Sequence, residues 1–228
     1  MSTKLTWLGH GCWQINAGDD VILLDPFLDD SPTAPVKSAD IECQFILVSH
    51  GHFDHISDVP QIAQRTGAQV IAVVEVAEWL KSHRQVENTV GMNIGGLIDL
   101  PWGSLKLTPA WHSSSMPDGS YGGQPVGFLL NIGGVKIYFA CDTALFRDME
   151  LIGEAELDVA VLPIGDHYTM GPEDSFKAIK YLKPRHVIPT HYNTWPPISQ
   201  DVEMWAEEVK THTSAWPVVL EPGDHFEC

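Results

Sequence analysis

The sequence contains few basic residues. Only 13 of its 228 residues are lysine or arginine, against 30 aspartates and glutamates, so its formal charge is −17. Proteins that bind nucleic acid along its phosphates need clustered lysine and arginine side chains. We therefore expect no nucleic-acid partner. A small to medium organic substrate is suggested instead by the glycine-rich residues 113–124 and by Tyr168, Tyr192 and Trp195, which we expect near the substrate. The charge does not exclude an anionic substrate, because bound divalent cations reverse the local field.

Cysteines and long hydrophobic runs are also few. The four cysteines form no Cys-x-x-Cys pair and no disulfide-dense pattern, which favours a reducing compartment. No apolar run approaches the ~20 residues of a membrane-spanning helix, and the first residues lack the basic start and apolar centre of a signal peptide. We therefore expect a cytoplasmic protein without a membrane partner. The sequence does not specify whether it forms a homo-oligomer.

Segments with the composition of a linker are absent. There is no proline- and serine-rich tract, no block of like charge and no low-complexity run. A hydrophobic content of 44% suits a globular protein with a sizeable core. We therefore expect residues 1–228 to form one domain.

The hydrophobic pattern predicts strands and helices along the whole chain. Strands are expected at residues 5–8, 12–15, 21–24, 45–48, 70–73, 105–108, 126–130, 135–139, 159–162, 186–189 and 217–220. Helices are expected at residues 57–65, 76–82, 172–182 and 201–210. The early strands follow one another as a meander, and the later ones alternate with helices. This order predicts an α/β protein with layers built on two mixed sheets.

A dense group of metal-ligand residues follows the expected strand at 45–48. Imidazole and carboxylate are ligands that ions such as Zn²⁺ prefer. His50 and His52 can project to one side of an extended backbone, because side chains two residues apart share a face. Asp54 and His55 fall where a helix should begin, displaced toward a neighbouring ion. A solvated polar loop is the simpler interpretation, but the order and spacing favour two ligands for each of two metals.

This pattern, His50-x-His52-x-Asp54-His55, resembles the signature of the metallo-β-lactamase superfamily. The resemblance implies a four-layer αββα sandwich, with two facing mixed sheets, helices outside and a metal site at one edge.

Further ligands are expected where strands end, because a rigid element fixes the geometry of a metal site. Three residues meet this condition: His112, Asp142 and His191. The resemblance implies that His112 joins the first ion with the histidines at 50 and 52. It also implies that His191 joins the second ion with residues 54 and 55, and that Asp142 bridges the two. A packed histidine is the simpler interpretation of each imidazole, and Asp142 could instead cap a helix at 144–149.

Other stretches narrow the resemblance to one branch. Segments that resemble uncharacterised metal-dependent hydrolases akin to ascorbate-6-phosphate lactonase occur at residues 7–10, 25–27, 164–166, 168–172 and 191–196. The β-lactam-cleaving enzymes are more distant. Cys141 departs from the pattern, since many relatives carry glycine before the bridging aspartate.

Four more residues are candidates for supporting roles. His10 is expected behind the ligands or facing the substrate, and His167 is a candidate proton donor to the leaving group. Asp25 and Asp166, each at a strand end, could orient metal-bound histidines through their second ring nitrogen. The alternatives are turn histidines, surface residues and turn caps.

These features predict a dinuclear hydrolase. Two divalent ions, with Zn²⁺ as the first choice and Mn²⁺, Fe²⁺ or Ni²⁺ as others, would hold a bridging hydroxide that cleaves an ester, lactone or phosphodiester bond. Asp54 and Asp142 would direct the hydroxide. Two alternatives stay open: a mononuclear iron oxidoreductase or dioxygenase on the same fold, and a non-catalytic metal-binding protein. A serine hydrolase is disfavoured, because the sequence has no Gly-x-Ser-x-Gly motif.

Overall fold

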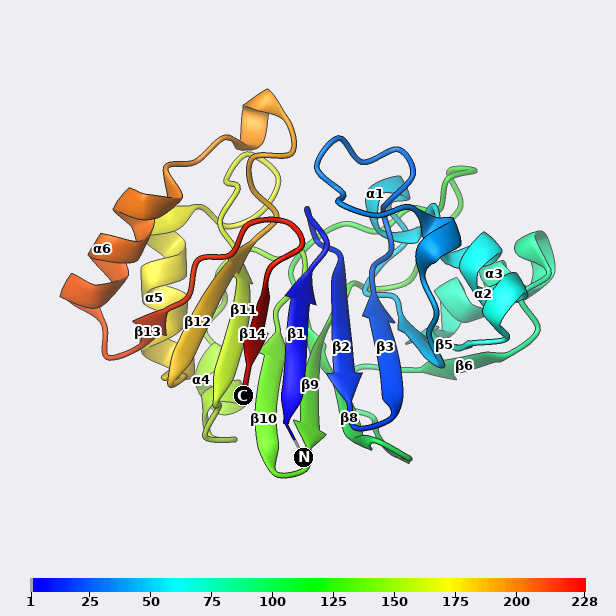
Figure 1. Cartoon of the computed structure of the whole chain (residues 1–228), viewed down its shortest axis with the longest axis horizontal. Helices are drawn as coiled ribbons and strands as arrows, with labels where there is room; N and C mark the ends of the chain where they lie inside the picture. The colour runs from blue at the N-terminus through cyan, green and yellow to red at the C-terminus, as the bar shows by residue number, and fades with distance from the viewer. Residues whose placement is uncertain (1) are drawn as a thin grey trace.

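Two seven-stranded β-sheets lie face to face in the computed structural model, which describes residues 2–228 (Figure 1). The strand order of the first sheet is β14-β1-β2-β3-β4-β5-β6. Its strands are β1 (Thr3–Trp7), β2 (Trp13–Ala17), β3 (Asp20–Leu24), β4 (Phe45–Leu47), β5 (Gln69–Val73), β6 (Thr89–Met92) and β14 (His225–Glu227). The sheet is antiparallel from β14 to β3 and parallel from β3 to β6, so it is mixed.

The second sheet repeats this division in the order β13-β12-β11-β10-β9-β8-β7. Pairs from β13 to β10 are parallel and pairs from β10 to β7 are antiparallel. Its strands are β7 (Leu97–Leu100), β8 (Gly103–Pro109), β9 (Val126–Ile132), β10 (Val135–Phe139), β11 (Val159–Pro163), β12 (His186–Thr190) and β13 (Trp216–Pro217). The β9–β10 hairpin turns at Gly133 and Gly134, as their positive φ angles require.

Helices cover the outer faces of both sheets, which completes the predicted four-layer αββα sandwich. Helix α3 packs on β5 and β6, whereas α5 packs on β11 and α6 on β13, at opposite sides of Figure 1. The helices are α1 (Phe53–Ile56), α2 (Val59–Thr66), α3 (Val74–Arg84), α4 (Met149–Gly153), α5 (Pro172–Leu182) and α6 (Val202–His212). Within residues 2–228, none of them is long and apolar enough to cross a membrane.

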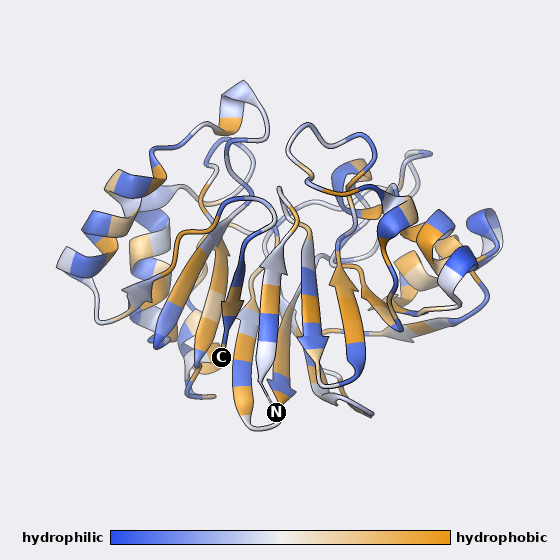
Figure 2. Cartoon of the chain, in the orientation of Figure 1, coloured by the Kyte–Doolittle hydropathy of each residue, from blue (hydrophilic) through white to orange (hydrophobic). Residues whose placement is uncertain are grey.

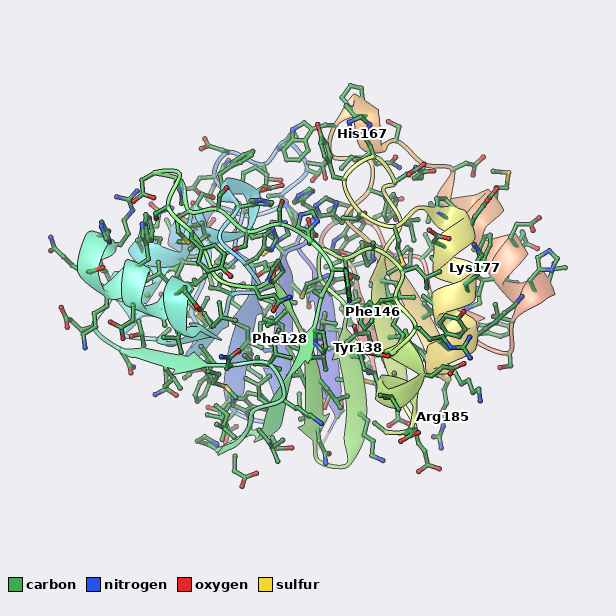
Figure 3. All side chains as sticks on the ribbon, turned by 180° about the vertical axis from the view of Figure 1, so that it is seen from behind. Phe128, Tyr138, Phe146, His167, Lys177 and Arg185 are labelled. Carbon is green, nitrogen blue, oxygen red and sulfur yellow. The ribbon has the colours of Figure 1, made fainter. Side chains whose placement is uncertain are left out.

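Hydrophobic side chains from both sheets fill the space between them. Trp13 on β2 and Phe139 on β10 meet edge to face across this space, with ring centroids 5.9 Å apart. Phe128, labelled in Figure 3, pairs with Phe139 and is fully buried on the same face. Tyr138, also labelled there, is fully buried on the opposite face of β10, because successive strand side chains alternate. Figure 2 shows the same division, with hydrophobic residues along the strands and hydrophilic ones frequent on the outer helices. Burying each such side chain contributes about 1.5–3 kcal/mol, so the core holds the strand ends in fixed positions.

One expected strand and one alternative are not found as stated. In place of the expected last strand at 217–220 there are the two residues of β13, after which the Val218 amide donates to the Val187 carbonyl of β12 and the chain turns toward β14. The alternative helix at 144–149 does not begin at residue 144. Helix α4 starts at Met149 after Asp148, so Asp142 is not a helix cap. The predicted helix at 172–182 is confirmed, and the one at 57–65 is found as α2, ended by Gly67 in a left-handed conformation.

Candidate metal centre

Two groups of potential metal ligands adjoin at the loop-rich edge of the sandwich. In each group, one nitrogen or oxygen of every member lies within 4.8 Å of one from each other member. The first group, after β4 and β8, contains His50, His52 and His112. The second contains His10, Asp54, His55 and His191. The structure therefore brings the residues of each expected ligand set together and adds His10 to the second group. It also places Asp25 beside His50 and His55, one from each set.

Asp142 lies between the two groups. Its Oδ2 is 3.1 Å from His191 Nε2 and 3.4 Å from His55 Nε2, both in the second group. The same oxygen is 3.5 Å from His112 Nε2 in the first group. One buried carboxylate oxygen therefore faces imidazoles of both groups, which is the arrangement that a bridging ligand needs.

Buried ring nitrogens without hydrogen-bond partners show that these residues fit a metal ion. Within residues 2–228, His191 Nδ1 is buried without a hydrogen bond, and so are His191 Nε2 and His55 Nε2, although Asp142 Oδ2 lies 3.1 Å and 3.4 Å from these two. Leaving a buried polar atom unsatisfied costs about 1–3 kcal/mol. A cation that accepts these lone pairs would remove that cost, so the donor set is suited to a divalent metal.

Asp25 and Ser49 fix the orientation of two of the histidines. Asp25 Oδ2 lies 2.9 Å from His55 Nδ1 and accepts a 2.5 Å hydrogen bond from Ser49 Oγ, whose oxygen lies 2.9 Å from His50 Nδ1. Asp25 Oδ1 accepts from the Ser49 amide at 2.7 Å. Asp25 therefore supports the ligands from the Nδ1 side of their rings. On the other side, His55 Nε2 faces Asp142, and His50 Nε2 lies 2.9 Å from His52 Nδ1. The predicted contact between Asp25 and a ligand histidine is present.

His10 is completely buried and supports Asp54. His10 Nε2 lies 3.1 Å from Asp54 Oδ2, and His10 Nδ1 lies 2.8 Å from Thr194 Oγ1. The carbonyl oxygen of His10 accepts hydrogen bonds from Trp7 Nε1 and Thr190 Oγ1. These contacts join β1, α1 and the loop after β12, so His10 positions the second group.

The protonation states favour metal binding at most of these residues. Burial lowers the pKa of His10 to about 3 and also lowers those of His50, His52 and His112, so their imidazoles are neutral at pH 7. Burial opposes ionisation of Asp142, but His191 and His55 hold its pKa well below the usual range. The hydrogen bond from His10 does the same for Asp54. Neutral imidazoles and ionised carboxylates are the forms that bind metals.

His55 differs from the other histidines. Burial lowers the pKa of this imidazole, but the nearby carboxylates of Asp142 and Asp25 outweigh burial and raise it well above its usual value. His55 therefore favours its protonated form when no cation is bound.

Four residues beside the ligands adopt left-handed backbone conformations. The φ angles are +50° at His10, +45° at Asp25, +53° at Cys141 and +56° at His191. Such conformations cost non-glycine residues of order 1–3 kcal/mol and concentrate at functional sites. The only hint in the sequence was Cys141, which stands where many relatives carry glycine. Glycine is the residue that this conformation favours.

Two predicted supporting residues lie apart from the ligands. His167 is on an exposed loop at the top of Figure 3, and its ring contacts Tyr168 at a centroid distance of 4.5 Å. Asp166 is exposed and accepts no hydrogen bond from a ligand histidine. Asp25 differs from Asp166 because its strand ends under the ligands rather than on an outer loop.

A cavity of about 780 Å³ opens above the two groups. Its floor includes ligand residues from both groups together with Asp142. Its walls contain Phe53, Met116, Tyr168 and Trp195. Tyr168, and not its neighbour His167, therefore reaches the site. This volume suits a small to medium organic molecule.

Known proteins with the same features are similar along nearly the whole chain. A profile described as a beta-lactamase superfamily domain matches residues 20–192. A UPF0173 metal-dependent hydrolase of Thermus thermophilus is 46% identical over 207 residues, which cover 91% of each chain. One from Deinococcus radiodurans is 44% identical and covers 98% of this chain and 99% of its own.

Solved structures agree with this result. Igni18, described as a novel metallo hydrolase from Ignicoccus hospitalis, is 34% identical with a TM-score of 0.89, covering 100% of this chain and 99% of its own. An isothiocyanate hydrolase from Delia radicum gut bacteria has a TM-score of 0.77 and covers 98% of both chains. At 17% identity, that second likeness shows a shared fold only.

Proposed function

Because the chain belongs to the UPF0173 metal-dependent hydrolase family of the β-lactamase superfamily, we propose that it hydrolyses an ester, lactone or phosphodiester bond of a small organic molecule. The observation that carries this proposal is the position of Asp142 Oδ2, within 3.5 Å of imidazole nitrogens from both ligand groups. A site of this form suits two metal ions better than one.

The proposed metal ligands are those expected from the sequence: His50, His52 and His112 for one ion, Asp54, His55 and His191 for the other, and Asp142 between them. Divalent ions bound there, with Zn²⁺ as the first choice, would activate water and stabilise the developing oxyanion. Whether Mn²⁺, Fe²⁺ or Ni²⁺ replaces Zn²⁺ depends on supply as well as on the ligands.

The remaining roles belong to residues around the cavity. Asp54 and Asp142 line it and are kept ionised, so each can accept a hydrogen bond from the attacking water and direct it. Tyr168 also lines the cavity, and its hydroxyl can donate a proton to the leaving-group oxygen. We assign this role to Tyr168 in place of His167, because His167 does not line the cavity. His10 holds the Asp54 carboxylate in position.

The proposal is tested by elemental analysis of the purified protein, followed by hydrolysis assays in the metal found. Esters, lactones and phosphodiesters form the three arms, and the lactone arm tests the narrower likeness to ascorbate-6-phosphate lactonase. Activity in any arm that is lost with chelator and restored by the metal supports the proposal. Metal-loaded protein that is inactive in all three arms would overturn it.

The oxidoreductase alternative is tested under the same conditions. Turnover that requires O₂ and iron, and that stops under anaerobic conditions, would favour an iron oxygen site over hydrolysis. We expect hydrolysis to continue without O₂. A mononuclear iron site would need only one group of ligands, whereas this chain has a second group with four further potential ligands. We also propose that the protein is cytoplasmic, forms a single domain and has neither a nucleic-acid nor a membrane partner.

A further inference from the structure

We infer that the substrate is a neutral ester or lactone that carries an aromatic or branched apolar group, and that the cavity selects against a second, anionic group. This inference rests on the proposed function, because it names the substrate of the same site. Three features of the cavity support it: one aromatic wall, one wall with an apolar tip on a fixed loop, and neutral side chains throughout the region above the ligands.

The aromatic wall is formed by Phe53 and Trp195, which come from α1 and from the loop after β12. Their ring centroids lie 6.2 Å apart, and both line the cavity. Phe27 packs behind them, at 5.8 Å from Phe53 and 5.9 Å from Trp195. Phe53 is nevertheless 57% exposed. An exposed aromatic ring that is supported from behind and borders a cavity is suited to cover an apolar ligand group.

The second wall is a loop held in place by its own contacts. Met116 and Pro117 line the cavity, and Met116 itself is buried. Asp118 anchors the loop tip, because Trp79 Nε1 donates to its Oδ2 at 2.8 Å. A bridge between Ser115 and Tyr121 closes the loop at its base. The apolar surface of this loop is therefore preorganised, which lowers the entropy cost of binding.

No lysine or arginine lines the cavity in the part of the chain that the structure describes. Apart from the proposed ligands, the lining side chains are aromatic, apolar or hydroxyl-bearing. A carboxylate, sulfonate or phosphate distant from the reacting bond would lose water there without gaining a cationic partner. A neutral substrate avoids this cost.

A matched pair of esters tests the inference directly. Phenyl butyrate and its 4-sulfonated analogue share the same acyl group and differ in one remote charge. The sulfonate is a weak metal ligand and makes the phenolate a slightly better leaving group, so chemistry alone would favour the charged ester. We expect kcat/KM to be at least roughly tenfold higher for the neutral ester. Equal or faster hydrolysis of the sulfonated ester would overturn the inference.

Substitutions at the cavity walls test which residues cause the preference for the neutral ester. Ser115, an exposed residue that lines the cavity, is the place to add a cation. Ser115→Arg should raise kcat/KM for the sulfonated ester and so reduce the ratio of the two kcat/KM values. Trp195→Ala should raise KM for phenyl butyrate severalfold, and Trp195→Phe should restore it. Trp216→Ala, at an exposed tryptophan outside the cavity, is the control and should change neither value.

Binding separates this inference from the proposed function. N-phenylbutanamide and its 4-sulfonated analogue are resistant amides with the same shapes as the two esters, and calorimetry on the metal-loaded protein measures both. If neither ester is hydrolysed but the neutral amide binds more tightly, the ester arm of the proposed function fails, whereas the selectivity of the cavity for neutral ligands is supported. If the sulfonated amide binds as tightly, or if neither binds at millimolar concentration, the inference is wrong.

Discussion

Asp142 Oδ2 lies 3.1 Å from His191 Nε2, although the two residues follow different strands, β10 and β12. Both strands pair in parallel with β11, so their carboxyl ends meet at one edge of the sheet. The contact between two distant parts of the chain is therefore a consequence of the topology. The core that fixes these strands also fixes the distance.

Removing the Asp142 carboxylate should disable the site. In Asp142→Ala, the three imidazoles that lie within 3.5 Å of Asp142 Oδ2 lose this shared carboxylate oxygen. We expect bound metal to fall and turnover to drop by on the order of 100-fold or more. Elemental analysis and kcat measure the two effects, with Asp99→Ala on exposed β7 as the control. Full metal content together with full turnover would contradict the assignment.

Asp25→Asn should weaken metal binding without removing a ligand. The amide that replaces Oδ2 would donate toward His55 Nδ1, so the ring would carry its proton on Nε2, the atom needed for the metal. We expect metal affinity to fall roughly 10- to 100-fold. Calorimetric titration measures the affinity. Asp166→Asn is the matched control, because Asp166 is exposed, and an equal loss there would show that the effect is not due to the contact with His55.

Substitutions at Cys141 test the cost of the left-handed backbone before Asp142. Valine is branched at Cβ and disfavours the φ of +53°, so Cys141→Val should lower the free energy of unfolding by about 1–3 kcal/mol. Cys141→Gly relieves the backbone but loses a buried thiol, so a net change within about 1 kcal/mol is expected. Urea denaturation measures both. Equal stability of the two variants would argue against strain at this position.

Asp58→Asn should show a pH-dependent effect on stability. Asp58 lies under the loop after β3, where its Oδ2 accepts hydrogen bonds from the amides of Leu28 and Asp29. Burial raises its pKa above the unfolded value of about 3.9. The folded state thus holds the proton more tightly than the unfolded chain, and this contribution to stability is lost as pH rises through the folded pKa.

The Asp58→Asn variant has no carboxyl group at this position and does not lose stability in this way as pH rises. The free energy of unfolding of the variant minus that of the unchanged protein should therefore increase from pH 4 toward neutral pH. Denaturation curves of both proteins at a series of pH values measure the difference. A difference that stays constant with pH would show that Asp58 has the same pKa in the folded and unfolded states.

The sequence predicted the two mixed sheets and the ligand candidates at residues 50–55 because each depends on a local pattern. The four-layer arrangement and the assignment of the dispersed ligands followed instead from the family resemblance. Buried strands read as apolar runs, and the segment from His50 to His55 carries its own spacing. The final strand β14 was not predicted, because it is only three residues long and partly polar. Its pairing with β1 depends on tertiary contacts.

The supporting contacts were harder to predict. Asp25 and Asp166 look alike in the sequence, since each follows an apolar strand, yet only Asp25 reaches a ligand histidine. The place of His10 in the second group also depends on where β1 ends in space. Likewise Tyr192, expected near the substrate, is buried against Trp7 at a centroid distance of 5.2 Å. Sequence spacing does not specify which of these side chains converge.

The central claim is that Asp142 and the two imidazole groups hold a pair of divalent ions that serve hydrolysis. The most direct test titrates metal-free protein with Zn²⁺ and follows both bound metal and hydrolysis of phenyl butyrate. We predict about two equivalents of metal per chain, with activity that rises as the sites fill. Protein that binds no stoichiometric metal, or whose hydrolysis is the same with and without it, would contradict the account.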